Sequence, residues 1–264
     1  GKGHLGRFVA RSLGVPLVAV ERDPALCAAG AAFASAQGLQ ARFEPTDALG
    51  PAAAAELTPG RLAIALHACG DLHAALIEQT ATTSLALAPC CVGRALPADR
   101  QARLLSAAGR ASRLVLDEAD LRLVHEHPSA GGEAEAPRLR ERQAYRLGLD
   151  LWFRAHGETG YRPIPAFPPS WTRDGFPEFC RRVIALIGHP TVHSSDSDLT
   201  EFEAAGWARL AQVRRRDALR AVFRAPLETW LVLDRALALE ERGYTVTVGT
   251  FCERAVTPRN ALIY

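Results

Sequence analysis

The chain has 264 residues, of which 48% are hydrophobic, and its mean hydropathy is −0.02. These values are typical of a soluble globular protein with room for one α/β domain and a large insertion, or for two small domains. No apolar run is long enough to span a bilayer and no signal peptide is evident, so we expect a cytoplasmic protein without a membrane partner. The net charge of +2 does not by itself indicate a nucleic-acid binder. The 31 basic residues are all arginine except Lys2, and this preference for arginine fits a GC-rich genome.

The first six residues, Gly1-Lys2-Gly3-His4-Leu5-Gly6, predict a glycine-rich turn that opens into a helix over 7–13. Glycine permits a tight turn and a close approach of the backbone to a ligand, and the helix start offers N–H groups to an acidic ligand group. Residues 17–21 predict a buried parallel strand ending in Glu21, where a carboxylate can reach a ribose diol. This geometry serves NAD, FAD and S-adenosylmethionine alike, and a glycine turn without a ligand is the alternative.

The next elements are a predicted alanine-rich helix over 25–37 and a short strand over 40–43. Asp47 follows in a loop that contains prolines. In an adenosine-binding site this carboxylate would accept a hydrogen bond from the adenine amine. Alternatively, Asp47 caps the helix that follows it.

A continuous apolar run over 62–66 predicts a central parallel strand, which leads into His67, Cys69 and Asp71. Ligands bind outside the carboxyl ends of the strands in open α/β sheets. We therefore expect these three side chains where substrate and cofactor meet. Asp71 is also predicted to cap a helix over 72–79.

A further apolar strand over 84–88 ends at Pro89 and the adjacent cysteines Cys90 and Cys91. Adjacent cysteines rarely bond to each other because the geometry is strained. We expect one to pack as a small hydrophobic side chain and the other to face the pocket. The six cysteines match neither a small secreted scaffold nor a metal site, which favours a reduced compartment and predicts no metal.

The middle of the chain is predicted to be mainly helical, with helices over 97–108, 138–156 and 176–187. Residues 113–124 fit either a strand or a helix. A long helix is predicted from Arg214 to near Gly243, with a kink at Pro226. Its first residues, Arg214-Arg215-Arg216, form either a solvated face or a surface that contacts phosphates.

The sequence ends in two β-rich segments, 244–251 and 261–264, joined by the turn Thr257-Pro258-Arg259-Asn260. Because no crossover helix lies between them, the two strands must be antiparallel. A parallel sheet finished by such a hairpin is the arrangement of the class I methyltransferase fold. A dinucleotide dehydrogenase does not need it.

Four segments (1–6, 66–72, 89–91 and 257–260) together resemble a bacterial group of S-adenosylmethionine-dependent methyltransferase-domain proteins. That group is similar to a eukaryotic methyltransferase-like family with a His-x-Cys-Gly-Asp and Cys-Cys pattern, and more distantly to enzymes that 2′-O-methylate the tRNA acceptor stem. The resemblance implies a Rossmann-like α/β fold whose core covers 1–94 and 217–264, with a mainly helical insertion over 95–216 for substrate recognition. The family has a strand before Gly1 that brings an acidic residue near the cofactor's amino group, and we expect this strand to be missing from the sequence.

The resemblance also implies roles for individual residues. Gly1 and Gly3 would face the methionine part of the cofactor, Glu21 would bind the ribose hydroxyls, and Asp47 would contact adenine. Cys69 and Pro89 would help to shape the methyl-transfer pocket. The expected cofactor-binding residues are Gly1, Gly3, His4, Leu5, Glu21, Arg22, Asp47, Ala48 and His67, and the expected catalytic residues are His67, Asp71, Cys90 and Cys91.

We therefore expect an S-adenosylmethionine-dependent methyltransferase whose acceptor is RNA, either tRNA or rRNA, with the acceptor inferred from the family. The protein would align acceptor and methyl group, and His67 would either remove a proton or fix the strand-end loop. A second mechanism uses Cys90 or Cys91 as a nucleophile toward a pyrimidine ring. The alternatives are a protein or small-molecule acceptor, an NAD-dependent oxidoreductase, and a non-catalytic binding module; the oligomeric state is left open.

Overall fold

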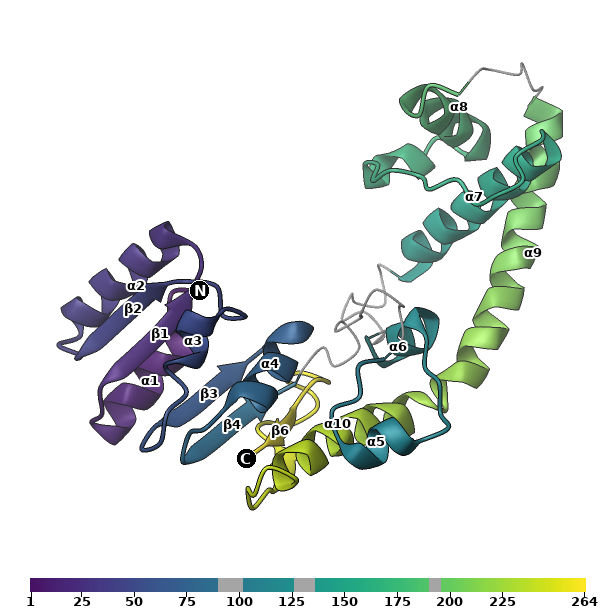
Figure 1. Cartoon of the computed structure of the whole chain (residues 1–264). Helices are drawn as coiled ribbons and strands as arrows, with labels where there is room; N and C mark the ends of the chain where they lie inside the picture. The colour runs from purple at the N-terminus through teal and green to yellow at the C-terminus, as the bar shows by residue number, and fades with distance from the viewer. Residues whose placement is uncertain (90–101, 126–135, 190–195) are drawn as a thin grey trace. The chain divides into compact units, whose positions relative to one another are not determined.

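A computed structural model describes residues 1–89, 102–125, 136–189 and 196–264 (Figure 1). The chain divides into two compact units. Unit 1 comprises residues 1–127 and 224–264, and unit 2 comprises residues 128–223. None of the described helices is both long enough and apolar enough to cross a membrane.

The N-terminal part of unit 1 alternates helices with parallel strands. α1 (His4–Leu13) leads into β1 (Leu17–Glu21), and α2 (Pro24–Ala36) crosses over to β2 (Ala41–Pro45). Asp23 caps α2, because its carboxylate accepts hydrogen bonds from two backbone N–H groups of the first turn. These four elements are those predicted, with ends that differ by up to three residues.

The second sheet of unit 1 has four strands in the order β3-β4-β6-β5. After the short helix α3 (Pro51–Ala54), β3 (Leu62–Leu66) is parallel to β4 (Ser84–Ala88), and α4 (Asp71–Gln79) joins them. β5 (Val248–Thr250) and β6 (Ala261–Ile263) form the predicted antiparallel hairpin, and β6 also pairs with β4. The prediction of parallel strands that alternate with helices and of a C-terminal antiparallel hairpin is confirmed. The expected single sheet is wrong, because among the described strands β1 and β2 pair only with each other and form a separate two-stranded sheet.

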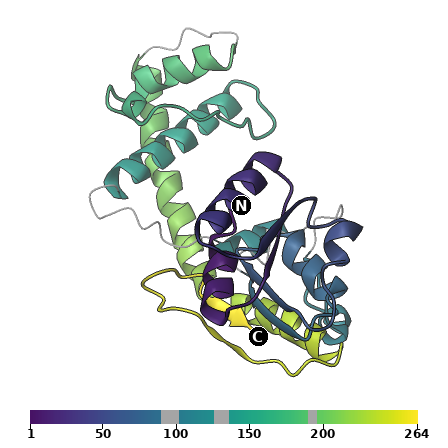
Figure 2. The same cartoon turned by 90° about the vertical axis from the view of Figure 1, so that its left-hand side faces the viewer.

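Three further helices belong to unit 1: α5 (Ala107–Ala111), α6 (Glu118–His125) and α10 (Arg224–Glu240). α10 packs with α4 against the four-stranded sheet, as Figure 2 shows, and contributes Val232, Ala236 and Leu239 to its core. Because α5 and α6 pack on α10, unit 1 extends to residue 127 and resumes at 224. The predicted domain boundaries were 94/95 and 216/217, so they differ from those of the compact units.

Unit 2 is helical and has its own aromatic core. Its elements are α7 (Ala136–Ala155), the 3-10 helix η2 (Pro169–Thr172), α8 (Phe176–Leu186) and α9 (Asp196–Ala221). Trp152, Phe176 and Phe179 are among the fully buried side chains that hold α7, α8 and α9 together. The predicted helical character of the middle of the chain is therefore confirmed for the described residues.

Two helical predictions are wrong in detail. The single helix expected over 214–243 is two helices, because α9 ends at Ala221 and α10 begins at Arg224. Pro226 lies in the first turn of α10, where a missing N–H removes no intrahelical bond, so this proline helps to start a helix rather than to kink one. In the helix expected over 97–108, residues 102–106 are not helical, because Ser106 is the N-cap of α5. The segment 113–124, for which a strand or a helix was expected, is helical from Glu118.

Candidate functional site

The glycine turn before α1 has the backbone geometry that only glycine adopts easily. Gly3 is the N-cap residue of α1 and has φ 67°, in the left-handed region. A Cβ atom on Gly3 would lie 2.9 Å from the Phe43 ring of β2, and one on Gly6 would lie 2.8 Å from Leu17 of β1. These glycines therefore let α1 start close against the two strands. No side chain caps the helix, so its first turn presents backbone N–H groups without a side-chain partner.

Glu21 lies beside this turn at the carboxyl end of β1. Its carboxylate contacts the backbone nitrogen of Gly1 and accepts a hydrogen bond from the Asp23 backbone N–H at 2.9 Å. A carboxyl group that accepts a backbone hydrogen bond in this way is an ionised acceptor at neutral pH. The predicted pairing of the glycine turn with Glu21 in space is present in the structure.

Asp47 follows the neighbouring strand, whose Pro45 is paired with Glu21. The Thr46 N–H donates to the Glu21 carbonyl at 3.1 Å, so the loop with Asp47 adjoins the end of β1. The Asp47 side chain is exposed and accepts a hydrogen bond from the Leu49 N–H at 3.0 Å. The helix that follows has Gly50 as its N-cap, so the interpretation of Asp47 as a helix cap is wrong.

The remaining residues predicted to bind the cofactor surround the same two strand ends. His4 contacts the Arg7 guanidinium through Nδ1 at 3.0 Å, and Leu5 is an exposed side chain in the first turn of α1. Arg22 and Ala48 are also exposed, after β1 and β2 respectively. The structure thus gathers this predicted set, apart from His67, at one end of the β1–β2 pair.

His67 and Asp71 lie in the loop that follows β3. His67 is exposed and has φ 59°, and it is the one non-glycine residue with positive φ among the described residues. Gly70, with φ 63° and ψ −129°, is the N-cap of α4. The predicted capping role of Asp71 is therefore wrong, because Asp71 is the first residue of the helix and forms an ion pair with Arg103 at 3.2 Å. Cys69 is half-buried in this loop, whereas Cys90 and Cys91 lie outside the described residues.

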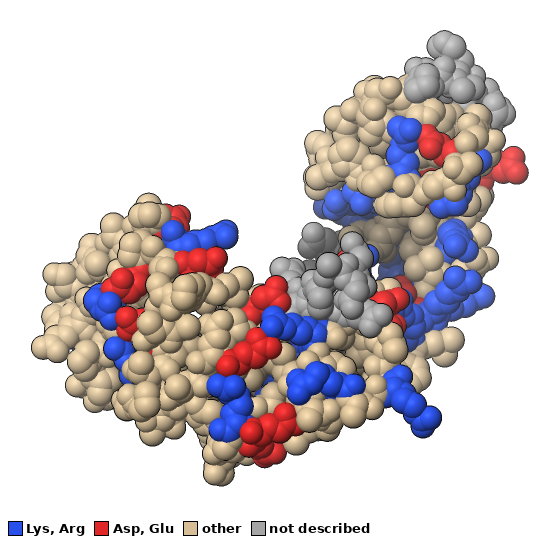
Figure 3. Space-filling model, in the orientation of Figure 1, with Lys and Arg blue, Asp and Glu red and all other residues tan. Residues whose placement is uncertain are grey.

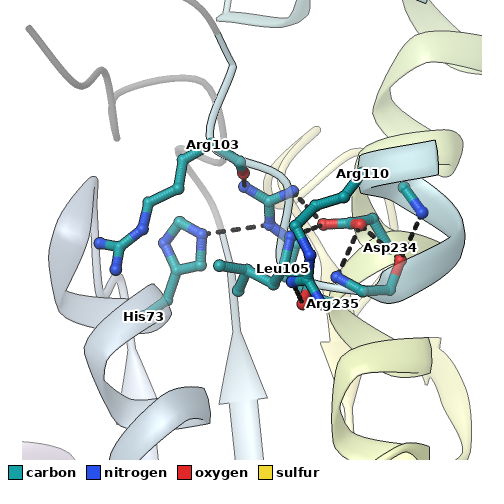
Figure 4. A network of polar contacts seen from close by, with 8 residues as sticks. His73, Arg103, Leu105, Arg110, Asp234 and Arg235 are labelled. Atoms are coloured by element: carbon teal, nitrogen blue, oxygen red, sulfur yellow. Dashed lines mark hydrogen bonds and ion pairs between the residues drawn. The ribbon is translucent and has the colours of Figure 1, made fainter. Parts of the chain in front are cut away.

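A buried polar network underlies this loop, and the sequence analysis missed it (Figure 4). His73 of α4 contacts the Ala68 carbonyl oxygen through Nδ1 at 3.2 Å and the Arg235 Nε through Nε2 at 3.4 Å. Arg235 and Asp234 of α10 form an ion pair at 2.8 Å, and both are almost completely buried. Arg235 also donates to the Arg103 carbonyl at 2.9 Å.

Asp234 is held by the segment that precedes α5. Its carboxylate accepts hydrogen bonds from the Leu105 N–H at 2.9 Å, the Ser106 N–H at 3.1 Å and the Ser106 hydroxyl at 2.7 Å. Buried charges of this kind are normally paired and fully hydrogen-bonded. One sequence signal was available: two adjacent charges interrupt an otherwise apolar stretch of α10, from Leu231 to Leu239.

Residues 1–94 match the family model described as Methyltransferase domain. The chain carries a methyltransferase domain. It is thus a methyltransferase enzyme, and such a domain implies the use of S-adenosylmethionine by inference from the family. No curated protein and no solved structure matches the chain.

The residues present fit that cofactor. An uncapped helix N-terminus suits the cofactor's carboxylate, because its N–H groups and dipole favour an anion. Glu21 supplies an ionised acceptor for a diol beside that terminus. Among the described residues no group of three or more histidine, cysteine or acidic side chains has the arrangement of a metal site.

Proposed function

We propose that this enzyme transfers the methyl group of S-adenosylmethionine to RNA, with tRNA or rRNA as the acceptor. The cofactor supplies an activated methyl carbon, so the protein has mainly to bind and align the two reactants. Glu21 binds the ribose hydroxyls, Asp47 accepts a hydrogen bond from the adenine amine, and the first turn of α1 binds the carboxylate. These assignments are supported by the position of all three groups at the ends of β1 and β2.

His67 is proposed as the group that accepts a proton from the acceptor hydroxyl or amine. Its exposed ring follows β3, at the edge of the sheet where ligands bind in open α/β folds. The positive φ of His67 supports a functional role, since strained residues of this kind cluster at active sites. Asp71 is proposed to orient the start of α4 through Arg103, and a nucleophilic role of Cys90 or Cys91 remains the alternative mechanism.

One structural observation supports RNA as the acceptor that the family resemblance implies, namely the arginine surface of unit 2. Figure 3 shows basic side chains along α9. Arg214, Arg215 and Arg216 are exposed there, and within the described part of the chain they form no hydrogen bond or ion pair. Consecutive arginines without carboxylate partners suit a phosphate backbone, which binds through charge and bidentate hydrogen bonds.

Replacement of these three arginines by alanine is expected to weaken binding of unmodified tRNA or rRNA by about tenfold or more. The slope of log affinity against log salt concentration should become shallower by about two, because each lost phosphate contact removes about 0.7–0.9 of slope. Binding is measured by fluorescence anisotropy at several salt concentrations, and transfer by incorporation of a radiolabelled methyl group.

The matched control removes three arginines that already have acidic partners, Arg154, Arg181 and Arg182. This variant loses the same formal charge from the same unit, yet it is expected to retain most of its RNA affinity and its salt slope. If both variants lost RNA affinity equally, the effect would come from net charge alone and would contradict a specific role of the three arginines. Methyl transfer to a protein or small molecule, with none to RNA, would overturn the proposal.

A further inference from the structure

The loop between β3 and α4 adopts a conformation that needs external support. His67 has φ 59° and Gly70 has ψ −129° with positive φ, both uncommon backbone conformations. Such conformations persist only where the surrounding structure fixes them. The loop carries His67 and Cys69, so whatever holds its backbone also sets where these side chains point.

His73 is the third residue of α4, and its side chain contacts the backbone of this loop. Its ring is fully buried, and Nδ1 lies 3.2 Å from the Ala68 carbonyl oxygen. A carbonyl oxygen only accepts hydrogen bonds, so Nδ1 must carry the proton. Nε2 is then the acceptor, which agrees with its contact with the Arg235 Nε–H at 3.4 Å.

Arg235 is itself fixed on two further sides. It pairs with Asp234 at 2.8 Å and donates to the Arg103 carbonyl at 2.9 Å, as the dashed lines of Figure 4 show. The Arg103 side chain returns to α4 and pairs with Asp71 and Glu78. The loop after β3 is thus connected, through hydrogen bonds of known direction, to the C-terminal helix α10.

We propose that His73 is a positioning residue for methyl transfer. Its Nδ1–H holds the Ala68 carbonyl and with it the backbone that carries His67, and Arg235 holds His73 in the tautomer that can do so. This role rests on the proposed function in one respect, since it takes the loop after β3 as part of the methyl-transfer site.

The electrostatics of the site agree with a neutral ring. Burial and the neighbouring Arg235 guanidinium lower the pKa of His73 from 6.5 to about 4. A protonated ring would place a hydrogen on both nitrogens and could not accept the Arg235 hydrogen bond. The neutral ring with the proton on Nδ1 satisfies both partners.

Two substitutions separate the two nitrogens of His73. In His73→Asn the side-chain amide lies near the place of Nδ1, so it still donates to Ala68 but does not reach Arg235. In His73→Gln the amide reaches the place of Nε2, so it still contacts Arg235 but not Ala68. Both variants lose the ring and leave a similar cavity, so a purely structural role would affect them equally.

The first measurement needs no ligand: the rate at which iodoacetamide alkylates Cys69, followed by peptide mass spectrometry. Cys252, which is also half-buried and lies between β5 and β6, is the internal reference. His73→Gln is expected to speed alkylation of Cys69 about tenfold, the factor that corresponds to the loss of one buried hydrogen bond, whereas His73→Asn should stay within about twofold. Equal rates in the two variants overturn the proposal.

The second measurement is steady-state methyl transfer. His73→Gln should lower kcat with KM for RNA unchanged, because the loop is misplaced while the acceptor surface of unit 2 is intact, and His73→Asn should retain most of kcat. If alkylation of Cys69 were faster in His73→Gln while kcat stayed unchanged, the role of His73 in methyl transfer would be overturned. Arg235→Lys keeps the charge beside Asp234 but lacks the Nε–H, so unchanged values in both measurements would overturn the role of Arg235.

These outcomes remain separate from the fate of the proposed function. A wild-type protein that transfers no methyl group to RNA would refute the proposed acceptor. The alkylation rates of Cys69 would still show whether His73 holds the loop.

Discussion

Glu21 is the residue on which the proposed cofactor binding depends most directly. It is ionised, lies at the end of β1 and contacts the glycine turn. Glu21→Ala is expected to weaken binding of S-adenosylhomocysteine more than about tenfold, because hydrogen bonds from a diol to a charged acceptor contribute about 1.5–3 kcal/mol each. Isothermal calorimetry measures this directly. Glu44→Ala, on the neighbouring strand, is the control, and an unchanged affinity in Glu21→Ala would remove Glu21 from the site.

His73 makes the stability of unit 1 depend on pH. Its pKa is near 6.5 in the unfolded chain and about 4 in the folded one, so between these values the unfolded chain binds a proton that the folded chain does not. The free energy of unfolding should therefore be highest above pH 6.5 and fall by up to about 3 kcal/mol as the pH drops toward 4. Urea unfolding across this window checks the effect, and His73→Gln should lack this part of the pH dependence. If the free energy of unfolding changed with pH equally in the wild type and in His73→Gln, His73 would not be the cause of the pH dependence.

At the scale of secondary structure, the β1–β2 pair depends on a close approach of α2. A Cβ on Gly30 of α2 would lie 2.2 Å from the Phe43 ring, and a Cβ on Gly3 would lie 2.9 Å from the same ring. Gly30→Ala should therefore destabilise the protein by about 1–3 kcal/mol through overpacking. In a Phe43→Leu background the same substitution should cost clearly less. Chemical denaturation of the four proteins measures the difference, and equal costs in the two backgrounds would show that the clash is not the cause.

At the scale of the whole molecule, unit 2 is expected to unfold independently of the methyltransferase domain. Its core is separate from those of unit 1 and includes the fully buried Trp152. Trp152→Ala should destabilise unit 2 by about 3–5 kcal/mol while leaving binding of S-adenosylhomocysteine unchanged. Trp207→Ala is the matched control, because Trp207 is exposed on α9. Calorimetric melting and ligand binding test this, and a parallel loss of cofactor affinity in Trp152→Ala would contradict independence.

Much of the fold could be predicted from the sequence because its signals are local. β1, β3 and β4 have the predicted bounds, since a buried parallel strand is a short apolar run that ends where polar or glycine residues begin. The hairpin of β5 and β6 followed from the lack of a crossover helix. The glycine turn and Glu21 were predicted to lie together, and they do.

The predictions that failed concern side chains whose partners lie far along the chain. Asp71 was expected to cap α4, but Arg103, 32 residues later, pairs with it. Asp47 was expected either to cap α3 or to contact a ligand, and Gly50 takes the capping position. Local sequence offers these carboxylates several roles, and the choice between them depends on which group lies beside them in space.

By itself, the sequence determined the order of the strands, the parallel direction of the first four, the hairpin and the methyltransferase domain at residues 1–94. These features follow from periodicity, composition and motif spacing, which are properties of neighbouring residues. Only the tertiary structure decided that His73, Arg235 and Asp234 form one buried network beneath the loop after β3. The physical reason is that a buried polar group must find its partner inside the protein, and that partner can come from any segment that the fold brings near.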